Sequence, residues 1–229
     1  MKWWNMNEEN WNKDKKKGAP PSGLFWTINE SAFGAGDEKT ALDMVRRLRM
    51  AILAINASPY EKNAHIIEFV AEGNAAESLK ILEGLQAITS HSGLVLLVRD
   101  SLSLAAQSKA DGIVFTDVEK AVEARSLIGD DPIIAAHLES VDEIPNNIDL
   151  AIFSDKCSMQ DITKVKISSP CTVMSNVALN NENCGAYVQA GCDFLNASEY
   201  LNAHPESPAK AAVNMLYAID LTVRPANAH

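Results

Sequence analysis

Short apolar runs alternate with amphipathic stretches along the chain from residue 24 onward. The runs are rich in β-branched or aromatic residues, and several are unbroken in apolarity, as in strands covered on both faces. There are eight: 24–28, 65–70, 93–98, 112–115, 132–136, 148–153, 170–174 and 192–197. Eight strands alternating with helices predict an α/β protein, a single (β/α)8 TIM barrel over residues 23–229. An open doubly wound sheet is the alternative, but no G-x-G-x-x-G follows any run.

The stretches between these runs predict helices. Thr40 is a suitable N-cap for the first helix, and Gly129 is suitable for the C-terminal end of the fourth. The fifth connection, 140–147, contains Pro145 and has room for only a turn of helix. Residues 208–221 predict the last helix.

Residues 1–22 differ in composition from the rest of the chain. They hold three of the four tryptophans (Trp3, Trp4 and Trp11), a lysine cluster at 13–17 and two adjacent prolines. Neither helical nor strand periodicity runs through them, which predicts a tail that is poorly ordered on its own. Two interpretations stay open: the tryptophans dock in a groove of a protein partner, or the tail folds back to cover apolar surface of its own barrel.

Composition excludes several classes of protein. The length of 229 residues suits one barrel, and a net charge of −10 argues against a nucleic-acid or anionic-membrane surface. No apolar run approaches 18 residues, and the N-terminus lacks the apolar core of a secretory signal. Four cysteines without C-x-x-C or zinc-ligand spacing predict reduced thiols in a cytoplasmic protein.

Two segments, 93–143 and 187–201, resemble the thiamine-phosphate synthase family, which includes the thiazole tautomerases. In that family a Q-x-R-x-K motif on the second strand holds pyrophosphate, because cations neutralise the leaving group. This chain has Glu68, Val70 and Glu72 in its place. The family's glycine-rich GIGGI after the seventh strand, which cradles a phosphate, is replaced by VMSNVALNN, with Ser175 and Asn176 at glycine positions.

The resemblance also bears on metal binding. The family's N-D at the end of the third strand supplies a magnesium ligand, and here the pair is Arg99-Asp100. Asp100 with Asp117, or with Glu119, leaves Mg²⁺ as a cofactor to consider, and no other cofactor is indicated. The simpler alternative for Arg99 and Asp100 is an ion pair or a contact that stabilises a loop.

His137 stands where the family presents a catalytic serine at the end of the fifth strand. Thiazole tautomerases place a histidine two residues further on, at the position of Glu139, and a two-residue shift keeps the same strand face. The catalytic candidates are therefore His137, Glu68 and Asp100, with the alternative that His137 is a hydrogen-bonded structural group. Candidate ligand-binding residues are Arg99, Glu72, Asn176, Asn196 and Ser198.

Two functions follow from this pattern. The favoured one is a divergent synthase-like barrel that has lost most phosphate-binding motifs and binds a small molecule or a protein partner without catalysis, or in a repurposed role. The alternative is an active thiamine-phosphate synthase, or a related transferase or isomerase, with a rebuilt site. Barrels of this kind often self-associate, so a homo-oligomer is an additional expectation.

Overall fold

A computed structural model describes residues 22–34, 36–58, 64–142 and 144–223. The expected tail, with Trp3, Trp4 and Trp11, lies outside the described residues except for Ser22. The side chain of Ser22 donates a hydrogen bond to the carbonyl oxygen of Cys192 at 2.6 Å, immediately before the first strand.

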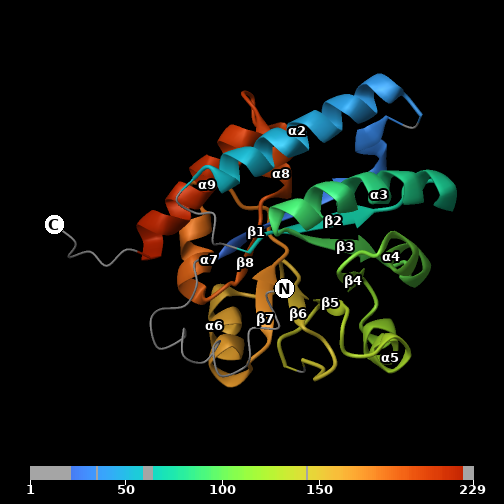
Figure 1. Cartoon of the computed structure of the whole chain (residues 1–229). Helices are drawn as coiled ribbons and strands as arrows, with labels where there is room; N and C mark the ends of the chain where they lie inside the picture. Colours follow the sequence, from blue (N-terminus) through green and yellow to red (C-terminus); the bar gives the residue numbers. More distant parts are fainter. Residues whose placement is uncertain (1–21, 35, 59–63, 143, 224–229) are drawn as a thin grey trace.

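Eight parallel strands pair in sequence order, and the last pairs with the first to close a barrel (Figure 1). This confirms the predicted (β/α)8 fold, with every predicted strand present. The strands are β1 (Gly23–Asn29), β2 (Ile66–Val70), β3 (Val95–Arg99), β4 (Gly112–Phe115), β5 (Ile133–Leu138), β6 (Leu150–Phe153), β7 (Thr172–Ser175) and β8 (Phe194–Asn196).

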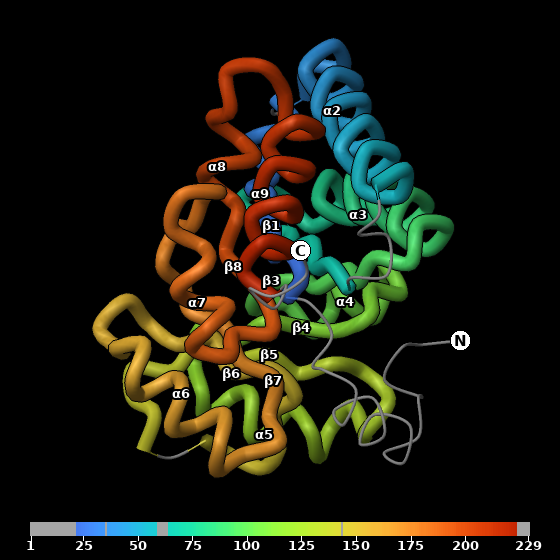
Figure 2. The backbone as a smooth tube through the Cα atoms, turned by 90° about the vertical axis from the view of Figure 1, so that its left-hand side faces the viewer, coloured from blue at the N-terminus to red at the C-terminus, as the bar shows by residue number. Residues whose placement is uncertain are grey.

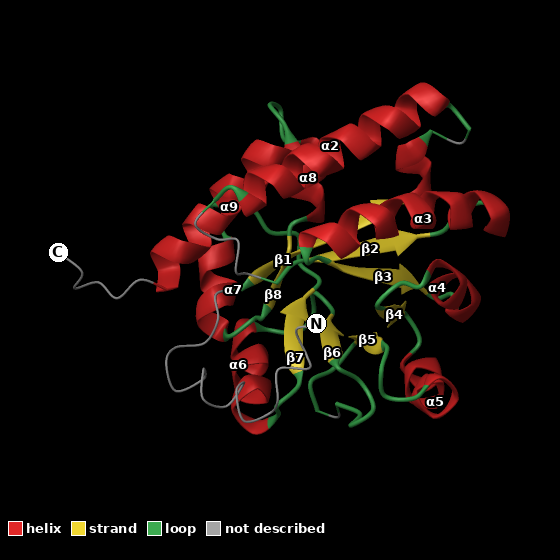
Figure 3. Ribbon diagram, viewed as in Figure 1, coloured by secondary structure: helices red, strands yellow, loops and turns green. Residues whose placement is uncertain are grey.

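Helices surround the barrel in the order α2 (Glu38–Asn56), α3 (Ala75–Ser92), α4 (Leu102–Ser108), α5 (Val118–Ile128), α6 (Met159–Ser168), α7 (Cys184–Ala190), α8 (Ser198–Ala203) and α9 (Pro208–Val223) (Figure 3). A 3-10 turn, η2 (Glu30–Phe33), follows β1. Helix α9 packs beside α2, so the last described helix closes the outer layer against the first one (Figure 2). In the described ranges, no helix is long and apolar enough to cross a bilayer.

One detail of the helix prediction, the N-cap of the first long helix, is wrong. Asp37, not Thr40, is the N-cap of α2, because its carboxylate accepts hydrogen bonds from the backbone N–H groups of Lys39 and Thr40. The connection from β5 to β6 contains no helix among its described residues. There Ser140 and Asp142 form a local side-chain hydrogen bond at 2.8 Å, and Pro145 lacks the N–H that a helix needs.

Alternation along the strands creates two cores. Inward side chains fill the barrel, while outward ones pack against the helices, so the strands are apolar on both faces. On β3, Val95 and Leu97 face inward and Leu96 and Val98 face outward. Arg99 therefore continues the inward face at the end of that strand. The interior set is Phe25, Ile66, Val95, Leu97, Val114, Ile133, Ala135, Leu150, Ile152, Met174 and Phe194.

His65, directly before β2, is a buried histidine that the fold holds neutral. Its side chain is enclosed, and its Nδ1 accepts a hydrogen bond from the backbone N–H of Leu24 at 3.2 Å. Burial lowers the pKa of His65 to about 4, because the charged imidazolium loses its hydration there.

We predict that His65 makes the protein less stable as the pH falls from 6.5 towards 4. The unfolded chain, with an ordinary histidine pKa near 6.5, binds the proton that the folded chain rejects. Urea unfolding at pH 7 and pH 4.5 should show an extra loss of about 2–3 kcal/mol in the native chain relative to His65→Asn. Replacing the exposed His91 by Asn is the control and should leave the pH dependence unchanged. An unchanged dependence in His65→Asn would contradict this assignment.

Candidate functional site

The C-terminal ends of the strands form the barrel mouth, the face where TIM barrels place their active sites. Side chains that continue the inward strand faces meet there: Thr27 from β1, Glu68 from β2, Arg99 from β3 and His137 from β5. Thr27 lies opposite Glu68 in the strand register, and Arg99 lies two residues beyond Leu97, the register partner of Glu68. Register and alternation together bring these polar groups side by side.

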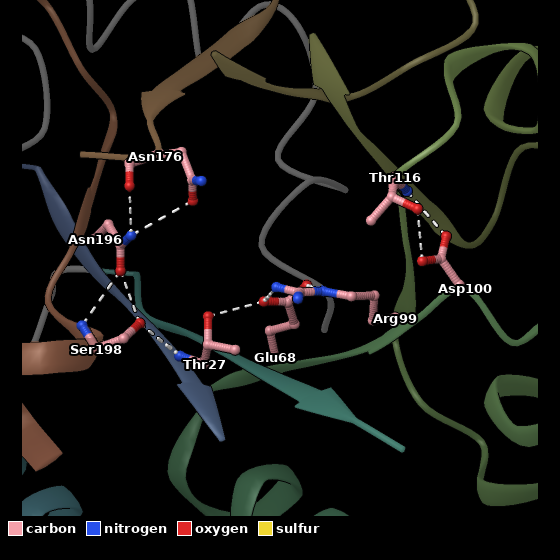
Figure 4. A network of polar contacts seen from close by, with 8 residues as sticks. All are labelled: Thr27, Glu68, Arg99, Asp100, Thr116, Asn176, Asn196 and Ser198. Carbon is pink, nitrogen blue, oxygen red and sulfur yellow. Dashed lines mark hydrogen bonds and ion pairs between the residues drawn. The ribbon is translucent and has the colours of Figure 1, made fainter. Parts of the chain in front are cut away.

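An ion pair between Glu68 and Arg99 occupies the centre of this group (Figure 4). Arg99 donates from Nε to Glu68 Oε1 at 2.8 Å and from Nη2 to Oε2 at 2.6 Å. The Thr27 hydroxyl donates to Oε2 of the same carboxylate at 2.8 Å. The Glu68 side chain has no exposed surface, whereas 27% of the Arg99 side chain remains exposed. The bidentate geometry and the third donor compensate the carboxylate's lost hydration.

The charge on Arg99 is committed to this pair. Burial alone would lower the pKa of Arg99, but the hydrogen bond and the charge of Glu68 outweigh it and raise the pKa. Asp100 adds a smaller effect in the same direction. The guanidinium is thus a permanent cation whose nearest neighbour is an anion.

His137 continues the inward face of β5, next to Ile152 in the register. Its Nε2 is buried and has no hydrogen-bond partner among the described residues. Burial lowers the pKa of His137, and the nearby charge of Glu68 opposes that effect only in part. A neutral imidazole at pH 7 with a free ring nitrogen can accept or donate a proton.

Asp100 and Asp117, the candidate magnesium ligands, stabilise their own loops. The carboxylate of Asp100 accepts from the Thr116 N–H at 2.9 Å and the Thr116 hydroxyl at 2.8 Å, and its backbone has a left-handed φ of 51°. Asp117 is the N-cap of α5 and accepts from the Glu119 N–H at 3.0 Å. Within the described ranges, no three His, Cys, Asp or Glu side chains gather as a metal site would require.

Glu72 lies in the loop between β2 and α3 rather than in the central group. Its carboxylate is exposed and accepts from the Ser31 N–H at 3.0 Å. In return, the buried Glu30 accepts from the backbone N–H groups of Glu72 and Gly73, each at 2.7 Å. The Glu30 carboxylate thus accepts hydrogen bonds from two backbone N–H groups of this loop. Glu72 in turn accepts one from η2, so the loop between β2 and α3 is held against η2.

Asn176, Asn196 and Ser198 form a chain of hydrogen bonds. It lies across the mouth from Asp100 and Thr116 (Figure 4). Asn196 donates to the carbonyl oxygen of Asn176 at 2.9 Å, and the Ser198 hydroxyl donates to Asn196 Oδ1 at 2.7 Å. The Ser198 oxygen also accepts from the Thr27 N–H at 2.9 Å. These polar groups after β7 and β8 therefore bind one another and connect with the Glu68–Arg99 pair through Thr27.

Lys156 follows β6, near the mouth. It pairs with Glu139, which follows β5, at 2.6 Å, and both side chains are largely exposed. The hydrogen bond from Lys156 to Glu139 raises the pKa of the lysine. Like Arg99, this cation has a carboxylate partner.

Two residues of this network were missed in the sequence analysis. Thr27 interrupts the first apolar run with a hydroxyl that reaches Glu68, and Thr116 follows the fourth run and holds Asp100. A polar residue on the inward face near the end of a strand is a usable signal for the mouth. Thr27 carries that signal, because it lies two residues beyond the inward Phe25.

Solved structures with this fold include several enzymes. Thiamine phosphate pyrophosphorylase from Pyrococcus furiosus superposes with a TM-score of 0.70 at 16% identity, over 88% of this chain and 97% of the other. A structure described as native KDPGal gives 0.64 at 14% identity, over 87% and 95%. Tryptophan synthase from M. tuberculosis gives 0.58 at 11% identity, over 95% and 98%.

These likenesses establish the class of fold, a TIM barrel like that of thiamine phosphate pyrophosphorylase. At such low sequence identity, a shared fold does not show that this chain has the activity of any of these proteins. No sequence-family profile matches the chain, and no curated protein matches it in sequence. The function has to be argued from the mouth itself.

We predict that Arg99→Met lowers the free energy of unfolding by about 3–5 kcal/mol, because it leaves the buried Glu68 carboxylate without its cation. The double variant Glu68→Leu/Arg99→Met should recover most of this loss, since apolar pairs often replace buried ion pairs without cost. Urea unfolding at pH 7 measures both. Lys156→Met, which breaks the exposed pair, is the control and should have no measurable effect. A double variant as unstable as the single one would show that Glu68 and Arg99 do not act as a pair.

Proposed function

We propose that this protein is a synthase-like barrel whose mouth binds a ligand or a protein partner and does not transfer pyrophosphate-activated groups. The observation that carries the proposal is the bidentate Glu68–Arg99 pair. It places a buried carboxylate where the resembling family has a cationic motif, and it neutralises the one arginine in the central group.

Electrostatics supports this reading. A pyrophosphate leaving group needs cations or oriented N–H donors at the point where its charge develops. Arg99 and Lys156 each have a carboxylate partner, and the Asn176–Asn196–Ser198 chain uses its polar groups internally. An incoming phosphate would have to compete with Glu68 for Arg99 and with Glu139 for Lys156.

The same groups indicate what kind of ligand fits. The buried Nε2 of His137 and the exposed part of Arg99 offer hydrogen bonds, while Arg99 and Lys156 are each already paired with a carboxylate and so do not favour an anion. The proposed ligand is a polar small molecule, or a segment of a protein partner, that is uncharged or positively charged.

The direct test is an assay for the activity that the resemblance implies. Purified protein is incubated with the aminopyrimidine pyrophosphate, the thiazole phosphate and Mg²⁺, and thiamine phosphate is measured by chromatography. We expect no product above a heat-killed control, while an authentic synthase under the same conditions forms it. Turnover above that control would refute the non-catalytic function.

A second candidate is a working transferase or isomerase with a rebuilt site. The observation that favours it is His137, a neutral histidine with a free ring nitrogen close to the Glu68–Arg99 pair. If such activity is present, His137→Gln should reduce kcat by roughly 100-fold or more, as loss of a general acid or base does. Glu139→Gln, on the exposed rim, is the matched control. Equal activity in His137→Gln and the native chain would exclude this residue as the proton-transfer group.

A further inference from the structure

The inward face of every strand changes from apolar to polar at the mouth. On each strand, the residue two places beyond the last apolar residue of the interior set has a polar side chain. Because side chains alternate along a strand, these residues continue the inward face. Two of them are Glu68 and Arg99, and the other six are Thr27, Thr116, His137, Ser154, Asn176 and Asn196. We call these residues the polar belt; those of β1 to β4, β7 and β8 are drawn in Figure 4.

The polar belt carries no net charge at pH 7. Glu68 and Arg99 neutralise each other, and burial lowers the pKa of His137, which keeps its imidazole neutral. The remaining side chains of the belt are hydroxyls and amides. Hydroxyls, amides and a neutral imidazole each offer both a donor and an acceptor of hydrogen bonds.

His137 and Ser154 are neighbours in the polar belt with buried polar atoms left unpaired. His137 pairs with Ile152 in the register, and Ser154 lies two residues beyond Ile152 on the same face. His137 Nε2 and Ser154 Oγ are buried and have no oxygen or nitrogen partner among the described residues. The Cys157 thiol beside Ser154 is only a weak hydrogen-bonding group. Since unpaired buried polar atoms cost free energy, a ligand that pairs with both recovers that cost.

The polar belt also distinguishes between classes of ligand. Phosphate oxygens accept hydrogen bonds and an ammonium group donates them, whereas each hydroxyl of a sugar does both. A belt of neutral groups that donate and accept therefore matches hydroxyl groups best. Directly below it, the interior residues Phe25, Leu97 and Ile152 form an apolar floor, which suits the C–H groups of a sugar ring.

We propose that the mouth binds an uncharged polyhydroxylated molecule, a free sugar or polyol, with one hydroxyl group on His137 Nε2 and a second on Ser154 Oγ. The exposed part of the Arg99 guanidinium is a further donor beside them. This inference rests on the proposed function, a mouth that binds a ligand without transferring pyrophosphate-activated groups, and it names the class of that ligand.

The test is saturation-transfer NMR on the full chain, titrated separately with glycerol, D-ribose and D-glucose. We expect saturable, millimolar binding of at least one of them, and weaker binding of its charged counterparts, ribose 5-phosphate and glucosamine. Ser154→Ala should weaken binding by about 2- to 10-fold, the effect of losing one neutral hydrogen bond, and His137→Phe by at least as much. Ser126→Ala, which removes an exposed hydroxyl on α5, is the matched control and should bind as the native chain does.

Three outcomes would overturn the proposal. Absence of saturable binding of all three neutral probes would exclude the ligand class, and tighter binding of ribose 5-phosphate or glucosamine would assign the mouth to a charged ligand. Binding that is unchanged in both Ser154→Ala and His137→Phe would place the sugar elsewhere. If His137→Phe does not fold, Ser154→Ala decides alone, because it removes a single oxygen atom. A chain that binds none of the neutral probes and forms no thiamine phosphate refutes only this inference, whereas product formation refutes the proposed function.

Discussion

The mouth of this barrel is organised around one fully buried carboxylate. Glu68 lies in the middle of β2 with no exposed surface, and a carboxylate in that position is tolerated only when charge and hydrogen bonds replace its hydration. Arg99 supplies the charge and two donors, and Thr27 supplies a third. Through Thr27 the same network reaches Ser198 and then Asn196 of β8. Side chains from four neighbouring strands, β8, β1, β2 and β3, are thus connected around Glu68.

This arrangement gives the two ends of the barrel different chemistry. At the mouth most of the described polar groups satisfy one another, and the ring nitrogen of His137 is among the buried exceptions. At the other end the first residues of five strands, together with Asp130 and Asp131, line a cavity. A barrel that binds phosphate needs unpaired cations or oriented N–H donors at its mouth.

The barrel could be predicted from sequence because its strands are short, apolar on both faces and separated by helical patterns. The central pair was not predicted as a pair: Glu68 was considered for catalysis and Arg99 for ligand binding, since contact between neighbouring strands depends on register, which a single sequence does not specify. Asp100 could be read from its residue type as a metal ligand, yet its oxygens bind Thr116.

The most direct measurement is the binding of pyrophosphate itself. If the ion pair with Glu68 prevents Arg99 from binding an anion, isothermal titration of the full chain with pyrophosphate and Mg²⁺ should show no saturable binding up to millimolar concentrations. Saturable binding that is lost in Glu68→Leu/Arg99→Met would contradict the account, because it would show that Arg99 still serves an anion at the mouth.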